Sequence, residues 1–280
     1  MILYTSLQTD IPAFYLDWFI ERIKSKYVDI PTLKHNTVER YDFEINKIDY
    51  VHFFTRDPSL LVKQMDEIKS LQLPFDVTVF MTFLDKYYEP KIKDKDIILN
   101  YIRKLSKQIG KKHTILGYGP IFKTSNNSLD WHINQFKFLC KILKKDISSV
   151  CIDFEINNYC QESKELNAIK LIDEEQKDMI KKLTKIAEEF KLNLTIKKKV
   201  EELEDNELDL GIPNSCLFSC KYCKYVTNMQ TLKTINSLHN KYSSLLIGSI
   251  NDSYKIINVN KKNKKNNNEI KQEYSQISFF

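Results

Sequence analysis

Short β-like runs alternate with longer amphipathic patterns along the first 200 residues, and this alternation limits the fold more than any other feature. Six apolar or β-branched runs occur, at residues 2–5, 50–54, 76–82, 114–118, 150–154 and 192–196. Between them, apolar side chains recur every three or four residues, as on the buried face of a helix; residues 129–143 and 173–190 show this most clearly. Repeated strand–helix units predict a parallel sheet covered by helices.

We expect these units to form a TIM-like α/β barrel, complete or partial, over residues 1–200. An open, doubly wound parallel sheet is the alternative. Either fold brings the carboxyl ends of the strands to one edge, where reactive side chains collect. Residues 201–250 are expected to form a cysteine-cluster segment packed on the barrel, with a last strand at 245–250. Residues 251–280 form a low-complexity tail rich in Lys and Asn.

Composition excludes several function classes. The five glycines form neither the Gly-x4-Gly-Lys-Ser/Thr pattern of a phosphate-binding loop nor the Gly-x-Gly-x-x-Gly pattern of a dinucleotide fold. The sequence has no run of about 18 apolar residues and no signal-peptide pattern, so we expect a cytoplasmic protein without membrane contact. In that reducing setting the six cysteines are expected to be core thiols or metal ligands rather than disulfides.

The net charge of +6 is uneven, because five Lys and two Glu within residues 261–273 contribute +3. A basic tail is one way to contact nucleic acid or an acidic surface. The favoured interpretation is a solvated end, since no aromatic stacking residues interrupt the Lys/Asn run.

Three cysteines in one short segment give the clearest chemical signal. Cys216, Cys220 and Cys223 are spaced Cys-x3-Cys-x2-Cys, with Tyr222 directly before the last of them. Three thiolates can hold three irons of a [4Fe–4S] cluster and leave the fourth iron open to bind S-adenosylmethionine. A structural zinc site is the alternative, but zinc takes four ligands, and only Cys160 or His239 is available as the fourth.

The cysteine spacing is similar to the signature of the radical S-adenosylmethionine superfamily. The chain as a whole resembles an uncharacterised family, domain of unknown function 1848, which places such a motif near the carboxyl terminus. The resemblance covers most of residues 1–250. It begins at Thr9-Asp10-Ile11-Pro12 and Phe54-Thr55-Arg56-Asp57-Pro58, continues through Glu89-Pro90, Tyr118 and His132, and ends at Asn236, His239, Ser243 and Leu245-Leu246-Ile247-Gly248. It implies a [4Fe–4S] cluster, S-adenosylmethionine as cofactor, an unknown substrate and a one-electron reductant of the flavodoxin or ferredoxin type.

The sequence departs from that family pattern at three places. Leu7 and Gln8 stand where the family usually has two arginines, and Gly117-Tyr118-Gly119-Pro120 stands where it usually has Arg-Tyr-Asp-Pro. A Cys-Gly-Cys pair upstream of the motif has no counterpart. These differences predict either a changed substrate or a protein that keeps the cluster without turnover.

Polar residues at the predicted strand ends complete the candidate site. We expect catalytic or substrate-binding roles for Asp10, Arg56 and Asp153. Cofactor-binding roles are expected for Tyr222, His239 and Thr55. Asp10 fits a helix N-cap before Pro12 equally well.

Other residues have a structural alternative to a site role. If Asp153 and Glu155 face the barrel mouth, they form a carboxylate pair with raised pKa values; if they face outward, they contact solvent. Glu89 is either a site residue or a surface carboxylate. His132 is expected to be structural, and Cys140 and Cys151 are expected to be core thiols.

The sequence therefore predicts an iron–sulfur protein that reductively cleaves S-adenosylmethionine to start radical chemistry on an unknown substrate. The alternative is a zinc- or cluster-stapled α/β scaffold without catalysis, which binds a partner or nucleic acid. A one-electron carrier is a third possibility.

Overall fold

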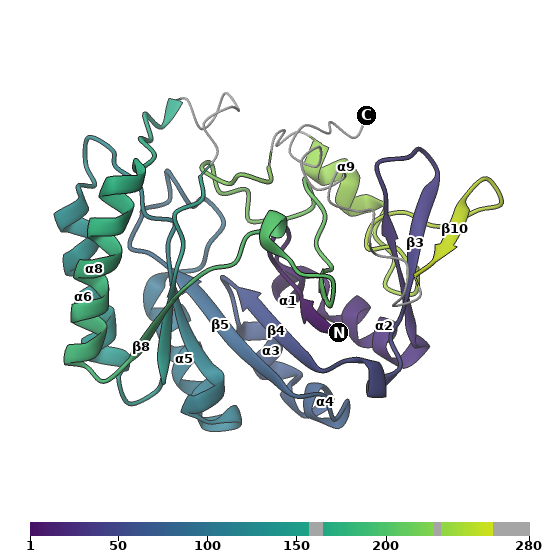
Figure 1. The fold of residues 1–280 in the computed structure, drawn as a ribbon, viewed down its shortest axis with the longest axis horizontal. Helices are drawn as coiled ribbons and strands as arrows, with labels where there is room; N and C mark the ends of the chain where they lie inside the picture. Colours follow the sequence, from purple (N-terminus) through teal and green to yellow (C-terminus); the bar gives the residue numbers. More distant parts are fainter. Residues whose placement is uncertain (157–164, 227–230, 260–280) are drawn as a thin grey trace.

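A curled sheet of seven parallel strands forms the centre of the computed structural model, which describes residues 1–156, 165–226 and 231–259 (Figure 1). The spatial order of the strands is β8-β7-β6-β5-β4-β1-β9. They are β1 (Ile2–Tyr4), β4 (Tyr50–Thr55), β5 (Phe75–Met81), β6 (Thr114–Tyr118), β7 (Ser149–Ile152), β8 (Asn193–Ile196) and β9 (Glu207–Asp209). Each of the six strands expected from the sequence corresponds to one of these, and β9 is additional.

The strand order distinguishes a barrel from a doubly wound sheet. From β1 to β8, each strand of this sheet lies beside the one before it, without the reversal that marks a switch point. β9 lies on the other side of β1, and in the described part of the chain it does not pair with β8. The expected α/β barrel is therefore confirmed in its partial form, a half-barrel that is open between β8 and β9.

Helices cover the convex outer face of the sheet (Figure 1). Their apolar stripes are buried there; for example, Ile102 of α5 and Leu183 of α8 are fully buried. The described ranges contain no helix long and apolar enough to cross a bilayer. The helices are α1 (Ile11–Phe14), α2 (Leu16–Ser25), α3 (Ser59–Lys63), α4 (Met65–Ser70), α5 (Lys95–Ile109), α6 (Leu129–Leu143), α8 (Asp173–Glu189) and α9 (Thr231–Ser237), with 3-10 turns at Ile45–Lys47, Lys111–His113 and Val200–Glu202.

A second, three-stranded sheet lies beside the half-barrel, at the right of Figure 1. In it β2 (Tyr27–Pro31) pairs antiparallel with β3 (Thr37–Asp42), and β10 (Lys255–Asn258) pairs parallel with β3. The sequence did not predict this sheet. The strand expected at 245–250 is wrong, because these residues form bends followed by irregular backbone, and the apolar members Leu245 and Leu246 are buried. The division into three segments stays a prediction.

The concave inner face of the half-barrel holds an apolar cluster separate from the main core. Side chains alternate between the two faces of each strand, so Phe54 and Phe80 point inward while their neighbours pack against the helices. Phe80 lies directly over Gly117, where an added Cβ would be 2.5 Å from the Phe80 ring. The cluster consists of Tyr4, Leu7, Phe54, Phe80, Cys151 and Leu203.

We expect Gly117→Ala to destabilise the protein by about 2 kcal/mol, because the added methyl group overpacks the site occupied by the Phe80 ring. In the background of Phe80→Ala, which removes the ring, the same change should cost much less. Urea unfolding of the four proteins of this double-mutant cycle measures the coupling. If the changes in unfolding free energy of the two single variants add up to that of the double variant, the Phe80 ring does not oppose a side chain at position 117.

Candidate functional site

The cysteine segment reaches the carboxyl ends of the strands by way of β9. β9 pairs in parallel with β1, with Tyr4 opposite Asp209, so the residues after both strands emerge at the same edge. The Leu210 amide donates to the Tyr4 carbonyl at 2.9 Å, and the Leu7 amide donates to Asp209 Oδ1 at 3.1 Å. The segment that follows β9 therefore runs beside the segment that follows β1.

Thr9 and Tyr15 fix the start of the cysteine loop. The Thr9 hydroxyl donates to the Ile212 carbonyl at 2.6 Å, accepts from the Ile212 amide at 3.1 Å and also contacts the Ser215 hydroxyl. The Tyr15 hydroxyl donates to the Ser215 carbonyl at 2.7 Å. Because Cys216 directly follows Ser215, these bonds place the first cysteine next to the end of β1.

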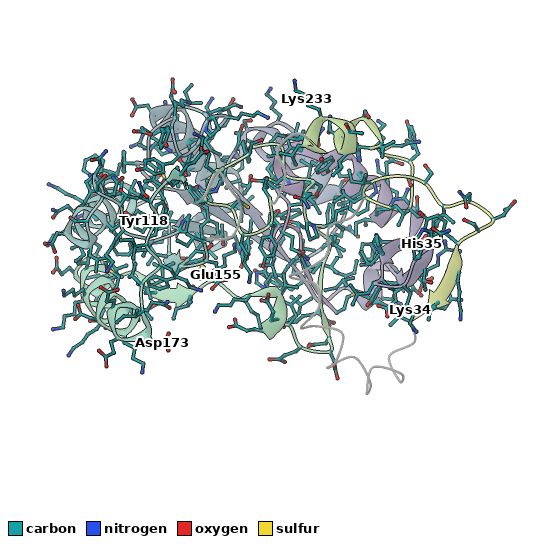
Figure 2. All side chains as sticks on the ribbon, turned by 90° about the horizontal axis from the view of Figure 1, so that it is seen from above. Lys34, His35, Tyr118, Glu155, Asp173 and Lys233 are labelled. Carbon is teal, nitrogen blue, oxygen red and sulfur yellow. The ribbon has the colours of Figure 1, made fainter. Side chains whose placement is uncertain are left out.

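The three cysteines line one open pocket together with most of the other predicted site residues. Figure 2 looks onto this end of the molecule and places Glu155, which also lines the pocket, near the middle. Of the predicted residues, His239 does not line the pocket. Those that do are Asp10, Thr55, Arg56, Asp153, Cys216, Cys220, Tyr222 and Cys223.

Burial raises the pKa of all three thiols, to about 12 for Cys220. The nearby carboxylate of Asp10 and the other two cysteines raise the pKa of Cys216 further. The Arg56 guanidinium has the opposite effect on Cys220 and Cys223. Three thiolates at this place therefore need additional positive charge, and a bound metal centre supplies it.

The donor atoms of the pocket are the three thiols and the carboxylates of Asp10, Asp153 and Glu155. In the described ranges, no three His, Cys, Asp or Glu side chains converge closely enough to hold one ion. The described lining of the pocket includes neither a histidine nor a fourth cysteine, and Cys160 lies outside the described residues. Zinc gathers four ligands around one ion, whereas a cluster spreads its thiolates over separate irons. The donor set fits a cluster with three protein ligands.

Asp10 combines a structural role with a place in the pocket. Its Oδ1 accepts from the Ala13 amide at 3.0 Å and caps α1, while Oδ2 accepts from the Arg56 amide at 2.7 Å. Burial raises the pKa of this carboxyl to about 7, even though these hydrogen bonds lower it. The Thr55 hydroxyl bonds both the carbonyl and the amide of Asp57, at 3.1 and 3.0 Å. Both side chains thus have fixed positions.

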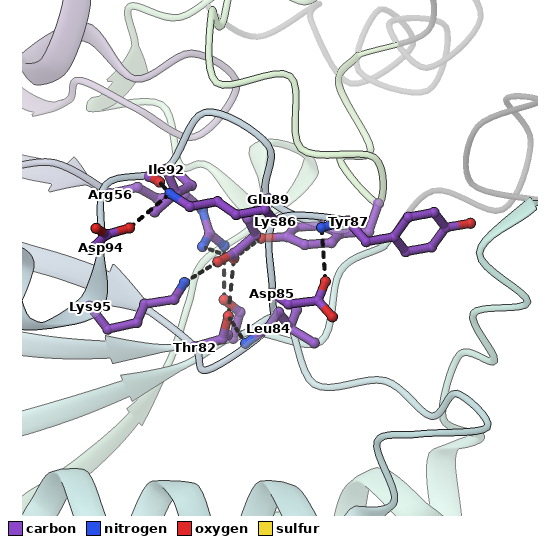
Figure 3. Close-up of polar contacts among 12 residues, drawn as sticks. Arg56, Thr82, Leu84, Asp85, Lys86, Tyr87, Glu89, Ile92, Asp94 and Lys95 are labelled. Carbon is purple, nitrogen blue, oxygen red and sulfur yellow. Dashed lines mark hydrogen bonds and ion pairs between the residues drawn. The ribbon is translucent and has the colours of Figure 1, made fainter.

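Glu89 is a buried hub beneath the cysteine loop (Figure 3). Its side chain is only 1 % exposed and accepts hydrogen bonds from Arg56 Nη1 at 2.9 Å, from the Thr82 hydroxyl at 3.0 Å and from the Tyr222 hydroxyl at 2.5 Å. Lys95 also pairs with it. A surface role for Glu89 is therefore wrong, and the partners that bury it come from sequence segments up to 133 positions away.

Arg56 connects this hub to the pocket wall. Its Nη2 donates to the Gly119 carbonyl at 2.8 Å, and its guanidinium carbon lies 5.5 Å from the centre of the Tyr222 ring. Together with the bonds to Glu89 and Asp10, these contacts join the ends of four strands to the loop that contains Cys220 and Cys223. The guanidinium is held in place by partners within the protein.

Asp153 and Glu155 lie in the loop after β7, which ends at Ile152. Asp153 pairs with Lys197 at 3.1 Å, and Glu155 pairs with Lys224 at 3.0 Å. Burial alone would raise the pKa of Glu155, but Lys224 and Lys199 outweigh it and hold the pKa below its usual value. The expected raised pKa is therefore wrong for Glu155, because three lysines that are distant in sequence reach this loop.

His239 reaches the cysteine loop through Tyr15, whose hydroxyl bonds the Ser215 carbonyl next to Cys216. Its ring packs 4.7 Å from the Tyr15 ring, and its Nδ1 lies 2.7 Å from the Leu246 carbonyl oxygen. His239 is not among the residues that line the pocket. Its expected contact with a cofactor stays a prediction.

His132, Cys140 and Cys151 are buried, as expected of structural residues. His132 Nε2 lies 2.8 Å from the Phe122 carbonyl oxygen, and burial lowers the His132 pKa to about 4. Burial raises the pKa of both thiols to about 12.

The barrel segment matches the model of a protein family. The family described as Domain of unknown function (DUF1848) matches residues 2–207, from the start of β1 to the start of β9. The chain belongs to this family. The DUF1848 match ends before Cys216, so the cysteine segment lies outside it.

The positions where the sequence departs from the expected family pattern have partners within the protein. Leu7 is 4 % exposed and belongs to the apolar cluster of the concave face. Gln8 Nε2 donates a hydrogen bond to Asp209 Oδ2 at 3.1 Å. Because the Gln8 amide is uncharged, this contact is not an ion pair. A Cβ at Gly119 would lie 2.5 Å from the Asp153 carbonyl oxygen. These positions now contribute packing and neutral hydrogen bonds.

This DUF1848 chain is also similar to solved structures of spore photoproduct lyase. One, complexed with dinucleoside spore photoproduct, has a TM-score of 0.45 and 13 % identity over 70 % of this chain and 61 % of the lyase. A mutant with bound AdoMet and dinucleoside spore photoproduct has a TM-score of 0.44 and 14 % identity over 69 % and 60 %. The chain thus spans about three-fifths of the lyase chains that it matches. No curated protein matches the sequence.

We expect Glu89→Gln to destabilise the protein by about 2 kcal/mol, because it leaves the partly buried guanidinium of Arg56 without its anionic partner. Tyr222→Phe removes one donor of the hub and should cost about 1 kcal/mol. Urea unfolding followed by circular dichroism measures both changes. Glu189→Gln is the control: Glu189 pairs with Lys137 on the surface, where both side chains are 52 % exposed, and its loss should cost less than about 0.5 kcal/mol. Equal losses of unfolding free energy in Glu89→Gln and Glu189→Gln would show that the contacts of Glu89 contribute no more than a surface ion pair.

Proposed function

We propose that this protein binds a [4Fe–4S] cluster through Cys216, Cys220 and Cys223 and uses S-adenosylmethionine to start radical chemistry on a substrate in the half-barrel. One observation carries the proposal: three thiols from a Cys-x3-Cys-x2-Cys loop line a single pocket at the carboxyl ends of parallel strands. The absence of a fourth cysteine or a histidine from the described lining supports an open iron.

When bound, such a cluster supplies one electron and a free coordination position, the two requirements for reductive cleavage of the cofactor's sulfonium. The residues of the chain would position the reactants. Asp10 and Thr55 offer oxygen acceptors suited to an amino group. Phe218, Tyr222 and Val226 are buried around the cysteine loop and restrict the access of water to it.

We assign the substrate to the part of the pocket near Asp153. The Lys197 ammonium holds this carboxylate at 3.1 Å and also lies 5.3 Å from the centre of the Phe80 ring. Asp153 would accept a hydrogen bond from the substrate, next to the apolar wall formed by Phe54 and Phe80. The reductant would be a one-electron carrier of the flavodoxin or ferredoxin type, and the cytoplasm supplies the reducing conditions.

The deciding experiment is anaerobic purification followed by iron, sulfide and zinc analysis. EPR of the dithionite-reduced protein is then compared with and without S-adenosylmethionine. We expect about four irons per chain and a spectrum that changes when the cofactor is added. Cys216→Ser, Cys220→Ser and Cys223→Ser should each lose most of the iron. Cys140→Ser is the matched control, since this thiol is buried in the main core, and it should keep the iron.

Each contrary result has a defined meaning. Stoichiometric zinc without iron would end the proposal in favour of a metal-stapled scaffold. A complete cluster whose EPR spectrum does not change when S-adenosylmethionine is added would instead indicate a one-electron carrier.

A further inference from the structure

The loop after β5 packs against the outer side of the cysteine loop. The Lys221 amide donates to the Tyr88 carbonyl at 3.1 Å, and Lys91 Nζ donates to the Ser219 hydroxyl at 3.1 Å. Ser219 and Lys221 flank Cys220 in the sequence. The surface formed by Tyr87, Lys91 and Lys221 therefore lies directly outside a proposed cluster ligand.

The lysines of this surface differ from nearby lysines in their charge pairing, and Asp85 of the same loop accepts from the Tyr87 amide at 2.8 Å. Two other lysines of the same loop pair with carboxylates, Lys86 with Asp94 and Lys93 with Asp57, and Lys95 at the start of α5 pairs with Glu89. By contrast, neither Lys91 nor Lys221 forms an ion pair with any carboxylate of the described residues. Both ammonium groups remain available to a negatively charged partner.

Tyr87 adds an exposed aromatic ring beside Lys221. Its side chain is 50 % exposed, and the Lys221 ammonium lies 4.0 Å from the centre of its ring. Figure 3 shows the ring pointing outward, away from Glu89. Tyrosine is enriched in protein–protein interfaces, where it contributes contact area at little entropic cost.

A short series of packed rings connects this surface to the cysteine loop. The ring centres are 5.3 Å apart for Tyr87 and Tyr88, 6.1 Å for Tyr88 and Phe122, and 5.5 Å for Phe122 and Tyr222. Tyr222 stands between Cys220 and Cys223 in the sequence. A redox centre docked at Tyr87 would be separated from the cluster by only a few packed side chains.

We infer that Tyr87, Lys91 and Lys221 form the docking surface for a small acidic one-electron carrier. The inference rests on the proposed function, which needs one electron to enter at the cluster. The carrier is oxidised by one electron and the cluster is reduced by one, so no other reactant is required. Opposite charges at the two surfaces speed the encounter and orient the carrier.

The test uses the full chain and a strongly acidic [2Fe–2S] ferredoxin. Binding is measured at low ionic strength, and reduction of the cluster by the reduced ferredoxin is followed anaerobically by stopped flow. We expect Lys91→Glu combined with Lys221→Glu to weaken binding and to lower the second-order rate constant by about tenfold. Added salt should slow the wild type and have little effect on this variant. Iron content and the final extent of reduction by dithionite should stay unchanged.

The matched control is Lys181→Glu combined with Lys185→Glu, which changes the charge equally at two exposed lysines of α8. This control should bind and accept electrons as the wild type does. The inference is overturned if both double variants behave alike, or if ferredoxin neither binds nor reduces a wild-type chain that dithionite reduces. If the purified chain contains no iron but its binding of ferredoxin still depends on Lys91 and Lys221, the docking surface stands. That result would refute only the proposed function.

Discussion

The parallel pairing of β9 with β1 is the interaction on which the candidate site depends. Only three residue pairs form this contact, from Ile2 and Glu207 to Tyr4 and Asp209. It nevertheless brings together segments 200 positions apart, so that Tyr15 can hold the backbone of Ser215. Parallel strands end at the same edge, and the cysteines therefore arrive beside Asp10 and Arg56. This register sets where the loop begins, and the bonds of Tyr15 and Glu89 then hold it.

Compensation of buried charge then fixes the geometry around the loop. Removing Glu89 and Arg56 from water costs several kcal/mol for each ion, and such a cost is offset only when the remaining donors and acceptors are bonded. Here Thr82, Tyr222 and the Gly119 carbonyl provide those bonds. Because Tyr222 belongs to the cysteine loop, the bonds that satisfy a buried ion pair also hold the proposed cluster ligands against the sheet.

The sequence predicted the parts of the structure that local patterns determine. Six strands followed from periodicity, and Asp10, Thr55 and Arg56 were recognised because parallel strands collect polar residues at one edge. The pattern of three residues in β9 is too short to indicate a strand. The role of Glu89 and the lysine partners of Asp153 and Glu155 depend on which distant segments meet, which periodicity does not encode. The small sheet was missed for the same reason, since β10 and β3 come from opposite ends of the chain.

The position of the cysteine segment has an evolutionary consequence. The segment follows the last strand–helix unit and interrupts none of the crossovers between β1 and β8. A descendant gene can therefore change, shorten or lose the cysteine segment while every crossover of the half-barrel stays intact. The strand–helix units and the cysteine segment therefore occupy separate stretches of the gene, although they meet in one pocket of the folded chain.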